Sequence, residues 1–98
     1  MADYTNASQQ RVLTILASLT GHELDGLTIT QIALMTESSA VQVTRDLYNL
    51  ELQGFVEREG DRWRHGKAVL DMFRAYSASL KMSIEKTLAE SLRVIKSS

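Results

Sequence analysis

The last third of the chain constrains its fold most strongly. From about Lys67 to Lys96 the sequence has no proline or glycine and repeats apolar residues at steps of mostly four, which predicts one continuous helix. Such a helix is about 45 Å long, longer than the small domain that the preceding residues can build. Its distal half carries an apolar stripe that no residue left in the chain can cover, so the sequence implies a partner.

The length allows one modest hydrophobic core and not two, since the chain has 98 residues. The chain has no cysteine, which excludes disulfides, thiolate nucleophiles and Cys-based zinc sites. Residues 1–6 lack the basic and apolar runs of a secretory signal, and no apolar stretch is long enough to span a membrane. These features together predict a cytoplasmic protein that does not enter a membrane.

The sequence holds no set of residues that is typical of catalysis. His22 and His65 lie in unrelated segments without a carboxylate at metal-ligand spacing, and the five glycines are isolated at element ends. We therefore expect no enzyme activity, no metal site, no cofactor and no small-molecule effector site. The net charge of −1 hides a mild asymmetry, because the acidic excess lies in residues 1–54 and the basic excess in residues 55–98.

The pattern before the long helix predicts three helices and a hairpin. The helices cover about 8–20, 29–35 and 39–53, and the hairpin pairs 55–59 with 62–64. Thr28 and Gln31 have the spacing of a capping box, and Leu27 is expected to form a single extended residue or a very short strand. Within the second helix we expect Ile32, Ala33 or Met35 to be buried.

The third helix and the hairpin each have an inward and an outward face. The helix is expected to turn Ala40, Val43, Leu47 and Leu50 toward the core. Alternation along the second strand sends Trp63 to one face, most simply into the core, and Arg62 and Arg64 to the other. This order of elements is that of a winged helix-turn-helix. The fold class is mainly α, with a winged domain over residues 8–66 and a C-terminal helix over residues 67–96.

Several segments between Gln10 and Phe73 resemble the amino-terminal domain of IclR-type bacterial regulators. The matching stretches are Arg11 to Leu16, Leu27 to Ala33, Val43 to Leu47, Leu50 to Arg58 and Arg62 to Gly66. The Arg45-Asp46-Leu47 and Gly54-Phe55-Val56 segments also resemble the DeoR and MarR-like groups. The resemblance implies a DNA-binding fold. Two features depart from the IclR pattern: Glu37 and Ala40 stand where that family usually has Gly and Lys, and a helix stands where the family has an effector domain.

The outward residues of the fold are candidates for contacts with double-stranded DNA. A recognition helix enters the major groove with its first turns at the base edges, and hydroxyls at helix starts can hold phosphates. Amide side chains can pair with adenine, arginine with guanine, and an apolar side chain with a thymine methyl. The candidates are Thr28, Thr30, Ser38, Ser39, Val41, Gln42, Arg45, Asn49, Arg62, Arg64, His65 and Lys67. Tyr48 is open between a DNA contact and local packing, and each polar candidate could instead be solvated surface.

The long helix is expected to join two copies of the chain. Its candidate dimerisation residues are Phe73, Tyr76, Leu80, Ile84, Leu88, Leu92 and Ile95. Packing against its own domain and docking on a different protein are the alternatives. The apolar step does not follow a strict heptad, so a short antiparallel pair or a bundle would also satisfy it.

The function expected from these features is sequence-specific binding of double-stranded DNA by a small dimeric transcriptional regulator of a prokaryote or phage. The alternative is a winged helix that serves as a protein-interaction or assembly module. The acidic first half of the chain favours that alternative, because phosphate contacts supply much of the affinity for DNA.

Overall fold

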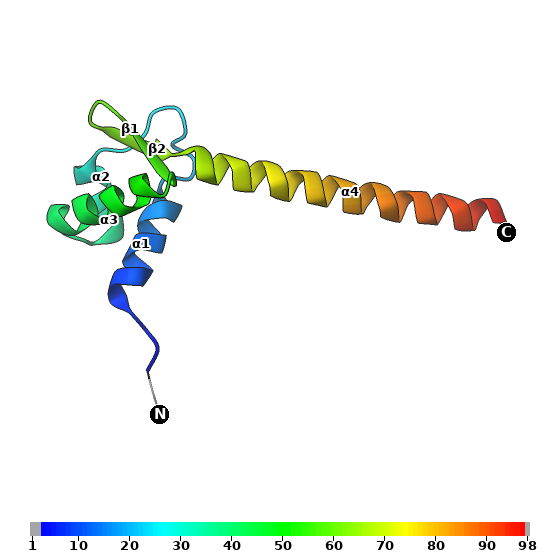
Figure 1. Cartoon of the computed structure of the whole chain (residues 1–98), viewed down its shortest axis with the longest axis horizontal. Coiled ribbons are helices and arrows are strands. Elements are labelled where there is room, and N and C mark those ends of the chain that lie inside the picture. Colours follow the sequence, from blue (N-terminus) through cyan, green and yellow to red (C-terminus); the bar gives the residue numbers. More distant parts are fainter. Residues whose placement is uncertain (1–2, 98) are drawn as a thin grey trace.

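Three short helices and a hairpin form a domain from which one long helix projects. A computed structural model of the chain describes residues 3–97. The elements are α1 (Ala7–Ser18), α2 (Ile29–Thr36), α3 (Ala40–Leu52), β1 (Val56–Glu59), β2 (Arg62–His65) and α4 (Lys67–Ser97). Figure 1 shows α1–α3 and the hairpin packed together, with α4 extending away from them. The predicted fold class is confirmed.

Local caps fix where the helices of the domain begin. The side chain of Asn6 accepts a hydrogen bond from the backbone N–H of Gln9 and starts α1. The predicted capping box of Thr28 and Gln31 starts α2, with both reciprocal hydrogen bonds present. Ser39 and Gln42 form a second capping box at the start of α3. These caps define the first residues of α1, α2 and α3.

The hairpin is extended by one residue from another part of the chain. β1 and β2 pair antiparallel, with Val56 opposite His65 and Glu59 opposite Arg62. Leu27 exchanges two backbone hydrogen bonds of 2.8 Å with Trp63, which confirms the prediction of a single extended residue. This bridge ties the loop before α2 to the wing.

One hydrophobic core holds the domain together. It consists of buried residues from α1–α3, from both strands and from the bridge: Ile15, Leu19, Leu27, Ile32, Val43, Leu47, Leu50, Val56 and Trp63. Trp63 therefore lies in the core, as expected. The prediction that Ala40 is buried is wrong, because Ala40 is exposed; of the alternatives given for α2, Ile32 is buried and Met35 is exposed. Ala40 is the first residue of α3 and lies at the rim of the domain, one turn short of the core packing that begins with Val43.

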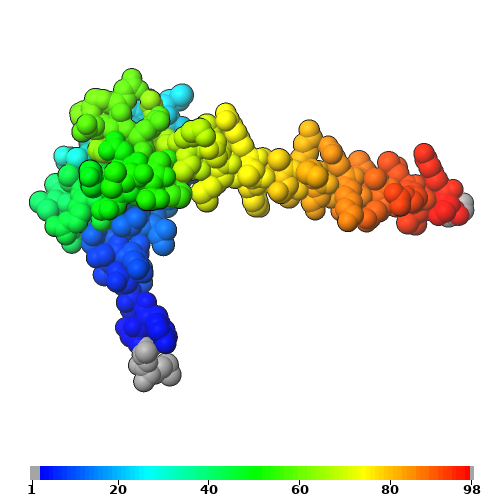
Figure 2. Space-filling model, in the orientation of Figure 1, coloured from blue at the N-terminus to red at the C-terminus, as the bar shows by residue number. Residues whose placement is uncertain are grey.

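The junction between the wing and α4 is closely packed at Gly66. A Cβ on this residue would lie 2.5 Å from the backbone oxygen of Gly54, so only glycine fits. The N–H of Gly66 donates to the carbonyl of Phe55, and the N–H of Ala68 donates to the carbonyl of Gly54. The first turn of α4 is thereby fixed to the start of β1. Beyond it, α4 forms an isolated arm in the space-filling view (Figure 2).

Candidate nucleic-acid interface

The outward face of α3 is exposed along the length of the helix. Val43, Asp46, Leu47 and Leu50 face inward and are buried. The opposite side presents a stripe at steps of three and four residues, made of Val41, Thr44, Arg45, Tyr48 and Leu52, all of which are exposed. Tyr48 is 59% exposed, so more than half of its surface is accessible to a partner. Thr44 was missing from the sequence prediction, although its position three residues after Val41 places it on this stripe.

Two predicted base-contacting amides already have partners within the helix. The side-chain oxygen of Gln42 accepts a hydrogen bond from the N–H of Ser39 at 3.1 Å. The Nδ2 of Asn49 donates to the carbonyl of Arg45 at 2.9 Å. A bidentate pair with adenine needs both the oxygen and the nitrogen of the amide. Gln42 would therefore have to release the cap of α3 to make such a pair.

The start of α2 and the turn before α3 place hydroxyl groups beside backbone N–H groups. Thr28 and Ser39 both serve as N-caps, while Thr30 is exposed in the first turn of α2. Ser38 lies in the turn and donates to the carbonyl of Thr36 at 3.1 Å. Helix N-termini attract phosphate through their free N–H groups. The local structure is thus compatible with the predicted phosphate contacts of Thr28 and Thr30, and it places Ser38 and Ser39 at the start of α3 as expected.

Glu37 ends α2 in a left-handed conformation. Its backbone has φ 53° and ψ 43°, and among residues 3–97 no other non-glycine residue has a positive φ. This is the position where the IclR pattern has Gly. An exposed carboxylate in the turn between α2 and α3 also repels phosphate.

The outer face of the wing is charge-balanced. The guanidinium of Arg64 bonds to Glu57 at 2.8 Å and to Glu59 at 2.7 Å, which raises the pKa of Arg64, mainly through the bond to Glu57. Arg62 lies on the same face, with its Nε 4.0 Å from a carboxylate oxygen of Asp61. Arg64 is therefore less available to a phosphate than the sequence suggested, while Arg62 keeps an exposed side chain.

The remaining wing residues do not extend that face. Arg58 stacks over the ring of Trp63 at 5.5 Å. His65 lies on the other side of β2 from Arg64, and its Nε2 donates to the carbonyl of Leu16 at 2.8 Å. Lys67 is the first residue of α4 and pairs with Asp71 at 2.6 Å. The predicted patch of Arg62, Arg64, His65 and Lys67 thus does not form one face.

A partly buried ion pair holds α3 against α1. The Nε of Arg11 lies 2.6 Å from Asp46, and a second bond of 3.2 Å makes the pair bidentate. The bond to Asp46 raises the pKa of Arg11. Asp46 is the buried charged residue of the described chain. Because Asp46 directly follows Arg45, this pair fixes how the outward face of α3 is oriented.

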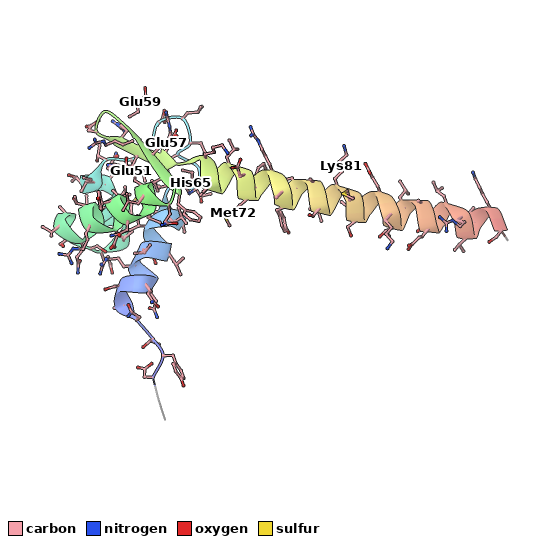
Figure 3. All side chains as sticks on the ribbon, in the orientation of Figure 1. Glu51, Glu57, Glu59, His65, Met72 and Lys81 are labelled. Carbon is pink, nitrogen blue, oxygen red and sulfur yellow. The ribbon has the colours of Figure 1, made fainter. Side chains whose placement is uncertain are left out.

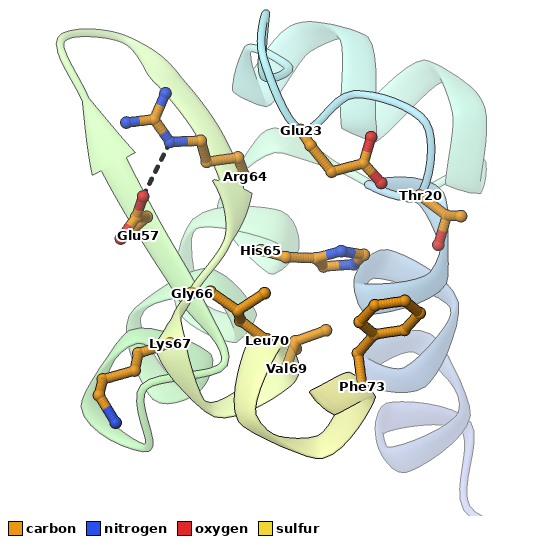
Figure 4. A pocket seen from close by; sticks show the side chains of 10 residues that line it. All are labelled: Thr20, Glu23, Glu57, Arg64, His65, Gly66, Lys67, Val69, Leu70 and Phe73. Carbon is orange, nitrogen blue, oxygen red and sulfur yellow. Dashed lines mark hydrogen bonds and ion pairs between the residues drawn. The ribbon is translucent and has the colours of Figure 1, made fainter. Parts of the chain in front are cut away.

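An apolar hollow of about 720 Å³ lies between the end of α1, the wing and the first turns of α4. Figure 4 shows His65 and Phe73 turned toward it, with Val69 and Leu70 on its floor. Glu23 lies at its edge, and a hydrogen bond from the N–H of Gly21 lowers the pKa of this carboxylate. The sequence did not predict this hollow, because its walls come from segments that are far apart along the chain.

Two kinds of site are not found in residues 3–97. No three His, Asp or Glu side chains in this range are grouped so that they could share a metal ion. None of the helices in the same range combines the length and apolar character that crossing a membrane requires.

Three helices followed by a two-stranded wing define a winged helix-turn-helix protein. No family profile and no curated protein sequence matches the chain. Solved structures do match it. An IclR transcriptional regulator from Silicibacter sp. TM1040 aligns with a TM-score of 0.64 at 23% identity, over 76% of this chain and 29% of that one. The resemblance to IclR-type regulators is thereby confirmed at the level of the fold.

Two further structures come from DNA-binding and regulatory proteins. MepR, a transcription regulator of a Staphylococcus aureus efflux pump, aligns with a TM-score of 0.56 at 26% identity, over 84% of this chain and 62% of that one. A MepR variant that matches similarly is bound to an oligodeoxyribonucleotide. The Zα domain of Cyprinid Herpesvirus 3, bound to Z-DNA, has a TM-score of 0.54 and 26% identity, over 61% of this chain and 98% of that domain. The chain thus spans less than two thirds of the IclR and MepR chains.

Proposed function

We propose that this chain binds double-stranded DNA through the outward face of α3, with the wing at its side, and acts as a small transcriptional regulator. The observation that carries the proposal is the exposed stripe of Val41, Thr44, Arg45 and Tyr48. α3 packs on α1, α2 and β1 with its other face, so the stripe is free to enter a major groove. The similar structures support DNA as the ligand, since two of them are bound to DNA.

The proposed regulator is dimeric, sequence-specific and cytoplasmic. Two copies joined through α4 would present two copies of α3 to a two-fold symmetric operator. In each copy, Arg45 is the residue best placed to read a base, because it is the exposed cation on the stripe. Arg62 is the wing residue best placed to meet the backbone, since Arg64 is held by two carboxylates.

Binding to duplex DNA across a salt series tests this proposal. We expect fluorescence anisotropy with a labelled random-sequence duplex to show binding that weakens steeply as salt rises. Arg62→Ala should lower the slope of log K against log salt by about 1, the value for a cation that neutralises a single phosphate, whereas Arg45→Ala should weaken binding and relax sequence preference at the base that it contacts. Arg62→Ala should weaken binding more than Arg64→Ala. A second duplex in the Z form extends the test to the ligand of the viral Zα domain.

Arg93→Ala is the matched control, because it removes the same charge from an exposed residue far along α4. It should leave affinity close to that of the wild type. If Arg93→Ala and Arg45→Ala weaken binding equally, the effect is one of net charge and the assignment of α3 is wrong. A folded protein that binds neither duplex at low salt would refute the proposed DNA binding.

One observation favours a second candidate, a protein-interaction module. The outer face of the wing pairs two carboxylates with Arg64, and Glu37 adds a further negative charge near α3. A charge-balanced surface suits a protein partner better than a polyanion. The salt series separates the two candidates, since only DNA binding gives a steep slope with a duplex.

A further inference from the structure

The spacing of the exposed apolar residues along α4 indicates what kind of partner covers them. The apolar residues Phe73, Tyr76, Leu80, Ile84, Leu88, Leu92 and Ile95 are all 49–70% exposed, and the helix contacts the domain only through its first turns. Side chains stand out on all sides of the arm in Figure 3. An apolar stripe of this length in water needs a cover, and its spacing indicates which cover fits.

The spacing of the apolar residues along this stripe is the same in both directions from Ile84. Its residues from Phe73 to Ile95 follow one another at steps of 3, 4, 4, 4, 4 and 3. Leu80 and Leu88 are therefore equally far from Ile84, as are Tyr76 and Leu92, and Phe73 and Ile95. A parallel pair of identical helices imposes no such symmetry, because each residue faces its own copy. An antiparallel pair with a two-fold axis at Ile84 requires it, because each residue then faces the one at the same distance on the other side.

The period of the stripe also suits a straight helix. Phe73, Ile84 and Ile95 are separated by 11 residues each. An 11-residue repeat corresponds to about 3.67 residues per turn, close to the 3.6 of an ordinary α-helix. Phe73, Ile84 and Ile95 therefore stay on one side of α4, within about 20° of Ile84, without the left-handed winding that a heptad needs. Tyr76 and Leu92 lie about 80° to either side of this line and form the two edges of the stripe.

The charges beside the stripe agree with the same axis. Lys81 and Glu85 lie on one flank of α4, three residues before and one residue after Ile84. In the antiparallel pair this flank faces the same flank of the second copy, which brings Lys81 and the Glu85 of the other copy to within about 3 Å along the axis. The register thus forms two symmetric ion pairs at the centre. Arg74 lies near the other copy's Lys96 at the solvated ends, where screening makes repulsion small.

We propose that the partner of α4 is a second copy of the chain, packed antiparallel with the two-fold axis at Ile84. This inference rests on the dimer in the proposed function and specifies its geometry. The axis is 17 residues from Lys67, so the first residues of the two α4 helices lie about 51 Å apart. The two winged domains are then at opposite ends of the pair. Their half-sites on DNA should be separated by more than one turn of the duplex, about 34 Å.

Cross-linking through single introduced thiols tests the register, and the cysteine-free chain provides a clean background. Ile84→Cys should form a disulfide-linked dimer under mild oxidation, because the two thiols meet at the axis. Phe73→Cys alone and Ile95→Cys alone should not cross-link, whereas a mixture of these two variants, one carrying a mass tag, should give the tagged heterodimer. Ala78 lies outside the apolar stripe, so Ala78→Cys is the control that should remain uncross-linked.

A charge exchange checks the same register without thiols. Lys81→Glu should raise the dimer dissociation constant measured by sedimentation equilibrium, and Lys81→Glu combined with Glu85→Lys should return it toward the wild type. Efficient cross-linking of Phe73→Cys with itself would overturn the antiparallel register, and a chain that stays monomeric at high concentration would overturn the dimer. Duplex binding by a monomeric chain would refute this inference alone. An antiparallel dimer without affinity for DNA would refute only the proposed function.

Discussion

Glu37 offers the most direct test of how the helix-turn-helix is built. An L-residue in the left-handed region costs about 1–2 kcal/mol, and Glu37 has φ 53°. Glycine avoids this cost, but it also raises the conformational entropy of the unfolded chain. That increase lowers the gain in folding stability by about 0.4–1 kcal/mol. We therefore expect Glu37→Gly to stabilise the domain by about 0.5–1 kcal/mol. For a domain of this size that corresponds to a rise in Tm of roughly 2–8 °C.

Glu37→Gln separates strain from charge, because it keeps a side chain in the strained conformation and removes only the carboxylate. Its Tm should stay near that of the wild type. Both variants remove one negative charge from the turn, and at about 10 Å from a phosphate in water one charge is worth about 0.4 kcal/mol. Each should therefore bind duplex DNA about twofold more tightly than the wild type at low salt.

The assay is thermal unfolding followed by circular dichroism, together with duplex binding by anisotropy. The ordering expected for Tm is Glu37→Gly above both Glu37→Gln and the wild type. If Glu37→Gly is no more stable than Glu37→Gln, the left-handed turn stores no strain and the reasoning from its backbone angles is wrong.

Three further tests probe the packing of α3 and α4 on the rest of the domain. Leu47→Ala should lower the free energy of unfolding, measured by urea denaturation, by about 3–5 kcal/mol, since Leu47 is fully buried. The same change at the exposed Leu52 should lower it far less. Equal losses at the two positions would contradict the assignment of Leu47 to the core. Gly66→Ala should lower Tm, because its Cβ meets backbone at 2.5 Å, and a wild-type Tm would show that the junction is loose. Asp46→Asn and Arg11→Gln should each lower Tm. In a double-mutant cycle, the double variant should lose less stability than the sum of the two single losses. Strictly additive losses would mean that the two side chains are not coupled.

Much of the fold was determined by interactions that are local in sequence. The capping box of Thr28 and Gln31, the extended backbone of Leu27 and the inward turn of Trp63 all followed from spacing and alternation, whereas the pairing of Leu27 with the distant Trp63 did not. Such features depend on residues within a few positions of one another, so the sequence displays them directly. The long α4 was equally evident, because nothing in residues 67–96 interrupts a helix.

The charge state of the candidate interface was decided only by the tertiary structure. Arg11 and Asp46 are 35 positions apart and meet because α1 crosses α3. Arg64 is held by Glu57 and Glu59 across the hairpin, and His65 turns toward α1, which follows from where the wing sits on the domain. Sequence periodicity assigns a residue to a face of its own element, whereas the neighbour that this face meets depends on how distant elements pack.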